Sequence, residues 1–255
     1  MRESLRTARG LWRSLGIYHG WQQRHRASTM DQLHRRFVKP GDLVFDIGAH
    51  VGDRVASFRR IGARVVAVEP QPAFATLIGL LYQHRFFTYF AGGKVLVERK
   101  AIGREVGEVG LMINSDNPTV STASSAFIQA AQDAPGWQGQ HWNKSIRVPM
   151  TTLDALIDTH GVPAFIKIDV EGYEEEALMG LTQPVAALSF EFTTIQRDIA
   201  RRCIDRCDAL GLTLFNAAIG ESQQLADWRS GEVMRRWIED LPHEANSGDI
   251  YARRP

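Results

Sequence analysis

The residues best suited to chemistry begin with a short segment, Asp46 to Gly52 with the sequence DIGAHVG, which combines a carboxylate with two glycines. Glycine allows the backbone to turn sharply and a ligand to approach it closely. If a helix begins after this turn, its unpaired N–H groups attract an anionic group. The carboxylate of Asp46 would instead repel a phosphate and attract a cation. The segment therefore suits a ligand that carries charges of both signs.

A second carboxylate, Glu69, follows the turn at about the spacing of the ribose-binding acid in nucleotide-binding α/β folds. Together with the turn it indicates a nucleoside with a zwitterionic arm, and S-adenosylmethionine meets that description. A nicotinamide cofactor of an oxidoreductase fits less well, because its G-x-G-x-x-G fingerprint needs glycine where this chain has Asp46. The same residues could also form a structural turn beside a solvated acid, or belong to a binding protein on an inactive enzyme scaffold.

Charged residues also interrupt the apolar run from Ala164 to Val170. A central parallel strand is normally apolar on both faces, and burying Lys167 and Asp169 without partners would be costly. Ligands of such folds bind at the carboxyl ends of the strands, so these residues are candidates for the site. A mutually neutralising ion pair is the alternative. Glu191 repeats the pattern on the next strand, where pairing with Lys167 or the backbone is as reasonable as a role in the site.

The pattern of apolar runs and helical periodicity indicates an α/β fold with a mostly parallel sheet and helices on both faces. Strands are expected at residues 43–47, 64–69, 94–98, 164–170, 187–192, 212–216 and 249–253. Helices are expected at residues 53–60, 72–86, 152–159, from 174 onward and at 196–210. These positions place each candidate carboxylate at or just beyond the end of a strand.

Residues 110–114 read as an extra hairpin strand, and residues 115–148 as a long polar loop. Loops of that length in compact domains are usually functional or disordered. We expect this segment to form a mobile lid over the bound substrate, in which Trp137 and Trp142 stack on a sugar or another ring. A well-packed surface excursion is the alternative.

The N-terminal segment is basic, with nine Lys and Arg against two Asp and Glu in residues 1–40. Residues 1–38 are therefore expected to form a basic amphipathic helical segment that precedes a catalytic domain at 39–255. Within residues 1–20 the arginines share one helical face, and Leu and Trp gather on the other. Such a helix can lie in a membrane interface. Alternatively, its apolar stripe packs on the catalytic domain.

Composition places the chain among ordinary globular proteins, with 255 residues, 44% hydrophobic residues and a net charge of +1. It shows neither an apolar run long enough to span a membrane nor the apolar core of a signal peptide, so we expect a cytoplasmic protein. Cys203 and Cys207 are expected to be reduced and packed, rather than bound to a metal.

Five segments carry a resemblance to a known family: LVFDIGAHVGDR, VVAVEPQP, TTLDALI, FIKIDVEGYEEEALMGL and LSFEF. They resemble the FkbM family of class I methyltransferases from about Lys39 to Phe192, and the core KIDVEG from Lys167 is the most specific. Residues 1–38, 115–148 and 193–247 match only loosely, and they would select the acceptor.

The resemblance implies a Rossmann-like, seven-stranded, mostly parallel sheet with an antiparallel last strand. It also implies methyl transfer from S-adenosylmethionine to a hydroxyl oxygen of a sugar, a polysaccharide unit or a secondary metabolite. Many members have Asn where this chain has His50. The implied cofactor-binding residues are Asp46, Gly48, Ala49, Gly52, Glu69, Ala101 and Asp169.

A hydroxyl group is a poor nucleophile, so a positioned base should remove its proton. The candidates are Asp169, His50 and Glu171, with His141 in the long loop as a further possibility. No metal is expected, although Asp169 and Glu171 could instead hold a divalent cation with oxygens of the acceptor. The expected partner is a small-molecule or glycan hydroxyl acceptor. Nucleic acid is not expected, because the body of the chain lacks a broad basic composition.

Overall fold

The computed structural model describes residues 10, 12–14, 16, 24–83 and 93–255. Among these residues, seven strands form the main sheet in the order β3-β2-β1-β7-β8-β10-β9. Neighbouring strands are parallel except at β10, which is antiparallel to both β8 and β9. The strands are β1 (Leu43–Ile47), β2 (Arg64–Val68), β3 (Val95–Glu98), β7 (Phe165–Ile168), β8 (Ala187–Thr193), β9 (Leu214–Ile219) and β10 (Ser247–Arg253). The expected Rossmann-like sheet and its antiparallel last strand are therefore confirmed.

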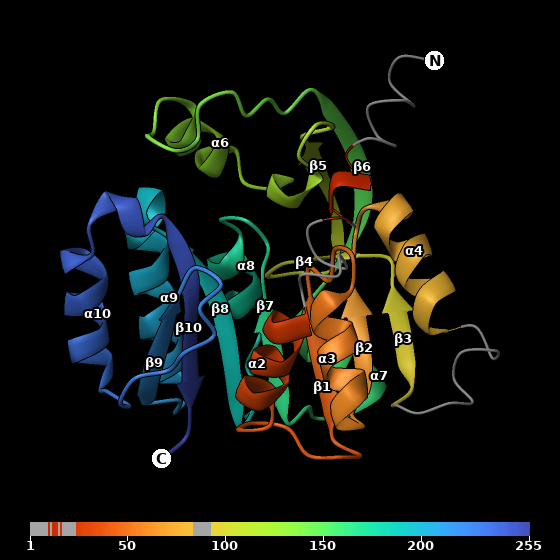
Figure 1. Ribbon diagram of the computed structural model, residues 1–255, viewed down its shortest axis with the longest axis vertical. Helices are drawn as coiled ribbons and strands as arrows, with labels where there is room; N and C mark the ends of the chain where they lie inside the picture. The colour runs from red at the N-terminus through yellow and green to blue at the C-terminus, as the bar shows by residue number, and fades with distance from the viewer. Residues whose placement is uncertain (1–9, 11, 15, 17–23, 84–92) are drawn as a thin grey trace.

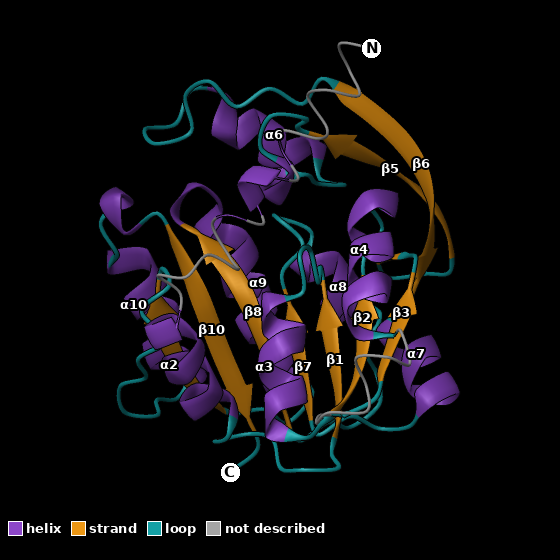
Figure 2. Cartoon of the chain, turned by 45° about the vertical axis from the view of Figure 1, so that its right-hand side comes forward, coloured by secondary structure: helices purple, strands orange, loops and turns teal. Residues whose placement is uncertain are grey.

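Helices cover both faces of this sheet (Figures 1 and 2). One face carries α2 (Arg24–His34), α3 (Asp53–Ile61) and α4 (Pro72–Tyr82). The other carries α7 (Leu153–His160), α8 (Glu174–Met179), α9 (Arg197–Ala209) and α10 (Gly231–Asp240). The sequence analysis missed α10, which Ser230 caps by accepting a hydrogen bond from the Val233 N–H. Short 3-10 turns lie at η3 (Thr194–Gln196) and η4 (His243–Ala245).

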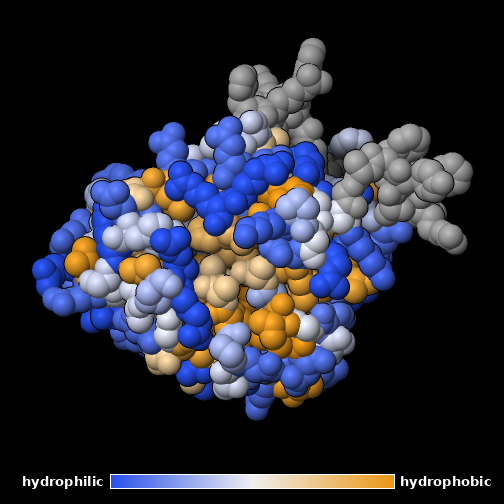
Figure 3. Space-filling model, turned by 90° about the horizontal axis from the view of Figure 1, so that it is seen from below, coloured by the Kyte–Doolittle hydropathy of each residue, from blue (hydrophilic) through white to orange (hydrophobic). Residues whose placement is uncertain are grey.

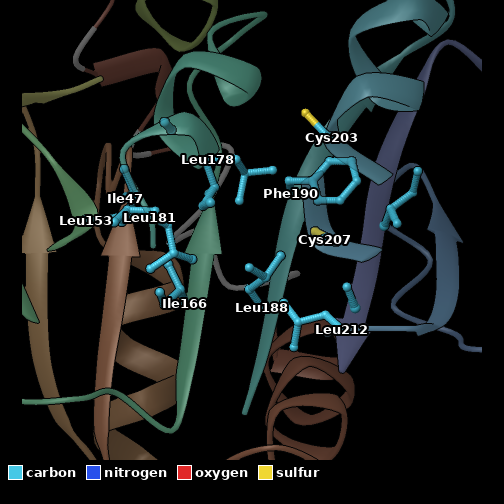
Figure 4. Close-up of a cluster of buried hydrophobic side chains, with 14 of the residues drawn as sticks. Ile47, Leu153, Ile166, Leu178, Leu181, Leu188, Phe190, Cys203, Cys207 and Leu212 are labelled. Carbon is cyan, nitrogen blue, oxygen red and sulfur yellow. The ribbon is translucent and has the colours of Figure 1, made fainter. Parts of the chain in front are cut away.

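The alternation of side chains along each strand divides the core into two layers. On β1, Phe45 and Ile47 belong to the layer under α7 to α10, and Val44 to the layer under α2 to α4. Figure 4 shows the first layer, in which Cys203 and Cys207 pack among leucines and isoleucines. Both cysteines are buried and not joined in a disulfide, as expected.

A second sheet of three strands, in the order β4-β6-β5, stands beside the carboxyl ends of the main strands. Its members are β4 (Ala101–Ile102), β5 (Gly107–Ile113) and β6 (Lys144–Thr151). Figure 2 shows β5 and β6 rising above the main sheet and curving over it. Between them lie η2 (Pro118–Val120) and α6 (Ser125–Gln132).

The expectation that residues 115–148 are mostly loop is wrong for α6 and for β6. In β6 the residues alternate between exposed and more buried, a strand pattern that buries Val148 and Met150. The excursion is also packed: the Trp137 indole is 7% exposed and donates to Asn246, and the Trp142 indole donates to the Val120 carbonyl. These contacts favour the packed excursion over the mobile lid, because both indole N–H groups are already used inside the protein.

Helix α2 is fixed to α3 by a buried polar network. The Ser57 hydroxyl donates to Asp31 at 2.6 Å and lies 2.8 Å from the His34 ring, and Arg60 pairs with the same aspartate. Burial, helped by the charge of Arg54, lowers the pKa of His34 to about 3, so this ring is neutral. The described end of the N-terminal segment is therefore packed on the sheet.

Most of residues 1–20 lie outside the described residues, so the amphipathic face and its membrane contact stay predictions. None of the described helices has the length and apolar character needed to cross a bilayer. The face of the molecule that Figure 3 shows, seen from below Figure 1, presents apolar residues interspersed with hydrophilic ones. Scattered exposure of this kind is normal on a protein surface.

Candidate active site

The carboxyl ends of β1, β2 and β7 surround two adjoining cavities. The large cavity has an empty volume of about 740 Å³, part of it open to solvent, and is lined by Ile47, Gly48, His50, Glu69, Pro70, Gln71, Lys100, Ala101, Ile102, Leu111, Thr119, Ser121, Ala123, Asp169, Val170, Glu171 and Tyr173. The small cavity has an empty volume of about 350 Å³, also partly open to solvent, and is lined by Asp46, Gly48, Ala49, His50, Asp53, Arg54, Lys167, Asp169 and Glu221. Three residues line both, so the cavities meet at the glycine turn.

The glycine turn brings β1 against the end of β7. Gly48 has a φ of 79°, and a Cβ there would lie 1.8 Å from the Asp169 carbonyl oxygen. Only glycine allows this approach. Gly52, with a φ of 78°, precedes α3 and faces Tyr82, whose hydroxyl donates to the Gly52 carbonyl at 3.2 Å. Gly52 is thus not among the lining residues, and the structure assigns it to the packing of α3 on α4.

Asp46 and Glu69 are both buried at the ends of their strands, 1% and 2% exposed. Burial, reinforced by the charge of Asp53, raises the pKa of Asp46 to about 7. Its Oδ2 atom has no hydrogen-bond partner among the described residues. Such an orphaned buried oxygen is costly, and a donor on a bound ligand would satisfy it.

The Glu69 carboxylate is held by two backbone N–H groups, those of His50 and Gln71, each at 2.8 Å. Burial raises the pKa of Glu69 to about 7 in spite of these two bonds. Each carboxylate oxygen has a second lone pair for another donor. Because Glu69 lines the large cavity, those lone pairs are available to hydroxyl groups of a ligand bound there.

Lys167 is the cation at the centre of the site, 3% exposed in its side chain. Its Nζ lies 3.1 Å from Asp169 and 2.9 Å from Asp249, a residue of β10 that the sequence analysis did not single out. Lys167 thus forms the ion pair that was the alternative to a role in the site. One of its two partners, Asp169, also lines both cavities. Burial alone would raise the pKa of Asp169, but the charges of Lys167 and Arg54 outweigh it and hold that pKa below 3.8.

Three carboxylates gather beside the shared wall of the cavities: ligand atoms of Asp169, Glu171 and Glu191 lie within 4.8 Å of one another. Burial, with the charges of Asp169 and Glu174, raises the pKa of Glu171 well above 4.5. Burial, with the charges of Asp169 and Glu171, does the same for Glu191. The backbone of Glu171 has a φ of 54°, and its carbonyl accepts a hydrogen bond from Thr122 at 2.7 Å. Glu171 and Glu191 therefore tend to stay protonated beside the ionised Asp169, and the oxygens of all three are of the kind that divalent cations prefer.

The structure brings most of the predicted site residues together. Gly48, His50, Glu69, Ala101, Asp169 and Glu171 line the large cavity, and Asp46 and Ala49 line the small one. The His50 ring packs against Phe74, with their centroids 4.4 Å apart. His141 is exposed and is not among the lining residues. Arg54, Gln71 and Tyr173 also line the cavities but were not predicted as site residues. All three lie in the segments that resemble the family, and that position was the available signal.

A family model for the methyltransferase FkbM domain matches residues 46–241, which include both cavities. The chain belongs to the FkbM methyltransferase family. No curated protein matches this methyltransferase by sequence.

Solved structures resemble it at low identity. An O-methyltransferase from Bacillus cereus in complex with SAH is 12% identical, with 96% of this chain and 90% of that chain covered and a TM-score of 0.47. Magnesium protoporphyrin IX methyltransferase from Synechocystis PCC 6803 with bound SAM is 12% identical, with 96% and 84% covered and a TM-score of 0.46. Precorrin-6y C5,15-methyltransferase from Geobacter metallireducens is 11% identical, with 90% and 87% covered and a TM-score of 0.44.

The methyl donor of this family is S-adenosylmethionine, and the residues of the site fit it. Glu69 offers oxygens to two ribose hydroxyls, and the orphaned oxygen of Asp46 suits an ammonium group. Gly48 lets β1 approach the Asp169 carbonyl, so that both residues line the two cavities. Ala101 and Ile102 offer apolar surface to an adenine ring on the wall of the large cavity.

Proposed function

We propose that this methyltransferase acts on a hydroxyl oxygen of a sugar, a polysaccharide unit or a secondary metabolite. The observation that carries the proposal is the cluster of Asp169, Glu171 and Glu191 beside the cavity for the methyl donor. A hydroxyl must lose its proton as it attacks, and a nearby carboxylate is a suitable acceptor for that proton. Thr119, Ser121 and Tyr173 also line the large cavity and offer hydrogen bonds to a polyhydroxylated acceptor.

When bound, S-adenosylmethionine supplies a methyl group that its sulfonium already activates. The protein therefore has to orient the acceptor oxygen and receive its proton, and orientation supplies much of the acceleration. Asp46 at the end of β1 and Glu69 at the end of β2 position the donor. The turn at Gly48 lets the donor lie close to the backbone.

Asp169 is the residue that we propose as the base. Lys167 keeps its carboxylate ionised, and 33% of its side chain remains exposed toward the cavities. Glu171 is the second candidate, because burial raises its pKa toward the range in which a base works best at neutral pH. His50 is the third, since it lines both cavities, but its ring lies against Phe74.

The test uses S-adenosylmethionine with a ¹³C-labelled methyl group and extracts of polar metabolites, polysaccharides and lipid-linked saccharides from the source organism. We expect a labelled product whose carbon chemical shift is that of a methyl ether. The matched control is Asp169→Asn, which should leave the extract unlabelled. A methyl ester, or a methyl group on carbon or nitrogen, would refute the proposal.

A further inference from the structure

The small cavity contains a cation that the proposed function does not use. Arg54 lies in the first turn of α3, and its side chain is 14% exposed. Its guanidinium pairs with the neighbouring Asp53, and with both carboxylate oxygens of Glu221 at 3.2 and 3.1 Å. Glu221 follows β9 and is 167 residues away in sequence, so this contact joins two distant parts of the chain.

The two Arg54 partners differ in how firmly the protein holds them. The Asp53 side chain is 14% exposed and also accepts the Arg54 backbone N–H at 2.9 Å. The Glu221 side chain is 50% exposed. Glu221 is therefore the partner that is more readily displaced from the guanidinium by another carboxylate.

The position of Glu69 sets the direction of the bound donor. Glu69 lines the large cavity and not the small one. A ribose held by Glu69 places the adenosine in the large cavity, among Ala101, Ile102 and Leu111. The amino-acid arm must then extend past Gly48 and Asp169, which both cavities share, into the small cavity. This step rests on the cofactor assignment given above.

The small cavity has charges that match such an arm. The orphaned oxygen of Asp46 would accept a hydrogen bond from the ammonium group. Arg54 is the cation better suited to the α-carboxylate, because one of its two partners, Glu221, is 50% exposed, whereas the two aspartates on Lys167 are 33% and 14% exposed. The Nη2 group of Arg54 now donates to both carboxylate oxygens of Glu221. A third carboxylate beside Arg54 would add uncompensated negative charge.

We propose that Arg54 binds the α-carboxylate of S-adenosylmethionine, and that Glu221 occupies the same guanidinium when no donor is bound. Binding of the donor then exchanges one carboxylate for another. Glu221 thereby competes with the donor and weakens its binding.

The test compares two ligands by calorimetry: S-adenosylhomocysteine, and 5′-methylthioadenosine, which lacks the amino-acid arm. Arg54→Met should weaken S-adenosylhomocysteine binding by about tenfold or more, the effect of losing charged hydrogen bonds. Its affinity for methylthioadenosine should change by less than about twofold. Glu221→Gln should tighten S-adenosylhomocysteine binding by about two- to fivefold, the size of an exposed ion pair, and leave methylthioadenosine unchanged. The matched control is Arg64→Met, at an exposed arginine of β2, which should change neither affinity.

Each other outcome overturns the proposal. Equal weakening of both ligands by Arg54→Met would make Arg54 a structural residue of the glycine turn. Weaker S-adenosylhomocysteine binding in Glu221→Gln would make Glu221 a ligand of the donor rather than a competitor. If the wild type binds neither ligand, the cofactor assignment fails together with the proposal. Should Arg54→Met not fold, the same two ligands are measured with Glu221→Gln and Glu221→Ala, which act on the exposed partner alone.

Discussion

The replacement of Glu69 by glutamine should weaken donor binding and at the same time spare the protein a buried charge. The folded-state pKa of Glu69 is raised from 4.5 to about 7, mainly by burial. A difference of that size corresponds to roughly 3 kcal/mol of lost stability when the group is ionised. Because the folded-state pKa is the higher one, this loss is absent below about pH 4.5 and complete above about pH 7.

Glu69→Gln removes the charge. It also places an amide NH₂ opposite one of the two backbone N–H groups that now donate hydrogen bonds to the carboxylate. An unsatisfied donor costs about 1–3 kcal/mol. At pH 8 the variant should therefore be as stable as the wild type or up to about 2 kcal/mol more stable, and at pH 5 it should be less stable. Replacing a charged by a neutral acceptor for two ribose hydroxyls should lower the affinity for S-adenosylhomocysteine about 30- to 100-fold.

Urea unfolding at pH 5 and pH 8 measures the first effect, and calorimetry measures the second. Asp46 has a similarly raised pKa, but it is present in both proteins and cancels in the comparison. A stability difference that does not change between the two pH values would refute the argument about the buried charge. Unchanged affinity would refute the role of Glu69 in holding the ribose.

Three further predictions follow from the site and the segments around it. Asp169→Asn should keep its affinity for S-adenosylhomocysteine within about tenfold and lose most of its turnover; if Asp169→Asn keeps its turnover and Glu171→Gln loses it, Glu171 is the base instead. Hydrogen exchange should show residues 125–132 protected in the unliganded protein, and Trp137→Ala should remove about 3–5 kcal/mol of stability; rapid exchange without ligand would restore the mobile lid. Residues 1–20 should carry binding to anionic vesicles that weakens with salt; a full-length protein that stays in the supernatant at low salt would contradict this.

The main sheet was predictable because its signals are local. Short apolar runs that alternate with helical segments indicate a parallel sheet, and the strand positions differ from the expected ones by only a few residues. Of the second sheet, only the hairpin strand at residues 110–114 was predicted, and it overlaps β5. The strand β6 was not predicted, since it contains Pro149 and begins in a polar segment. Its burial comes from pairing with β5, a contact that the hydropathy of residues 115–148 does not reveal.

The site shows the same division between local and distant signals. Asp46, Glu69 and Asp169 are recognisable in the sequence because each is an acid at the end of an apolar strand. The structure gathers them at one edge of the main sheet. Asp249 and Glu221 reach the site from the last strand and from the segment after β9, so only the folded chain shows that they belong there. An acid within an apolar strand, as at Asp249, was the one available signal.

The two sheets contribute different walls of the large cavity, and this has a consequence for engineering. Leu111, Thr119, Ser121 and Ala123 contribute one wall of the large cavity, and all belong to the excursion built on β5 and β6. The opposite wall comes from the main sheet, which carries the cofactor residues. β5 and β6 pair with each other along their length, but hydrogen bonds from Trp137 to Asn246 and from Thr122 to Glu171 fix the excursion to the main fold, so single wall residues are better targets than the whole excursion. Libraries confined to Thr119, Ser121 and Ala123 would therefore change the acceptor range and leave the donor-binding carboxylates on the main sheet unchanged.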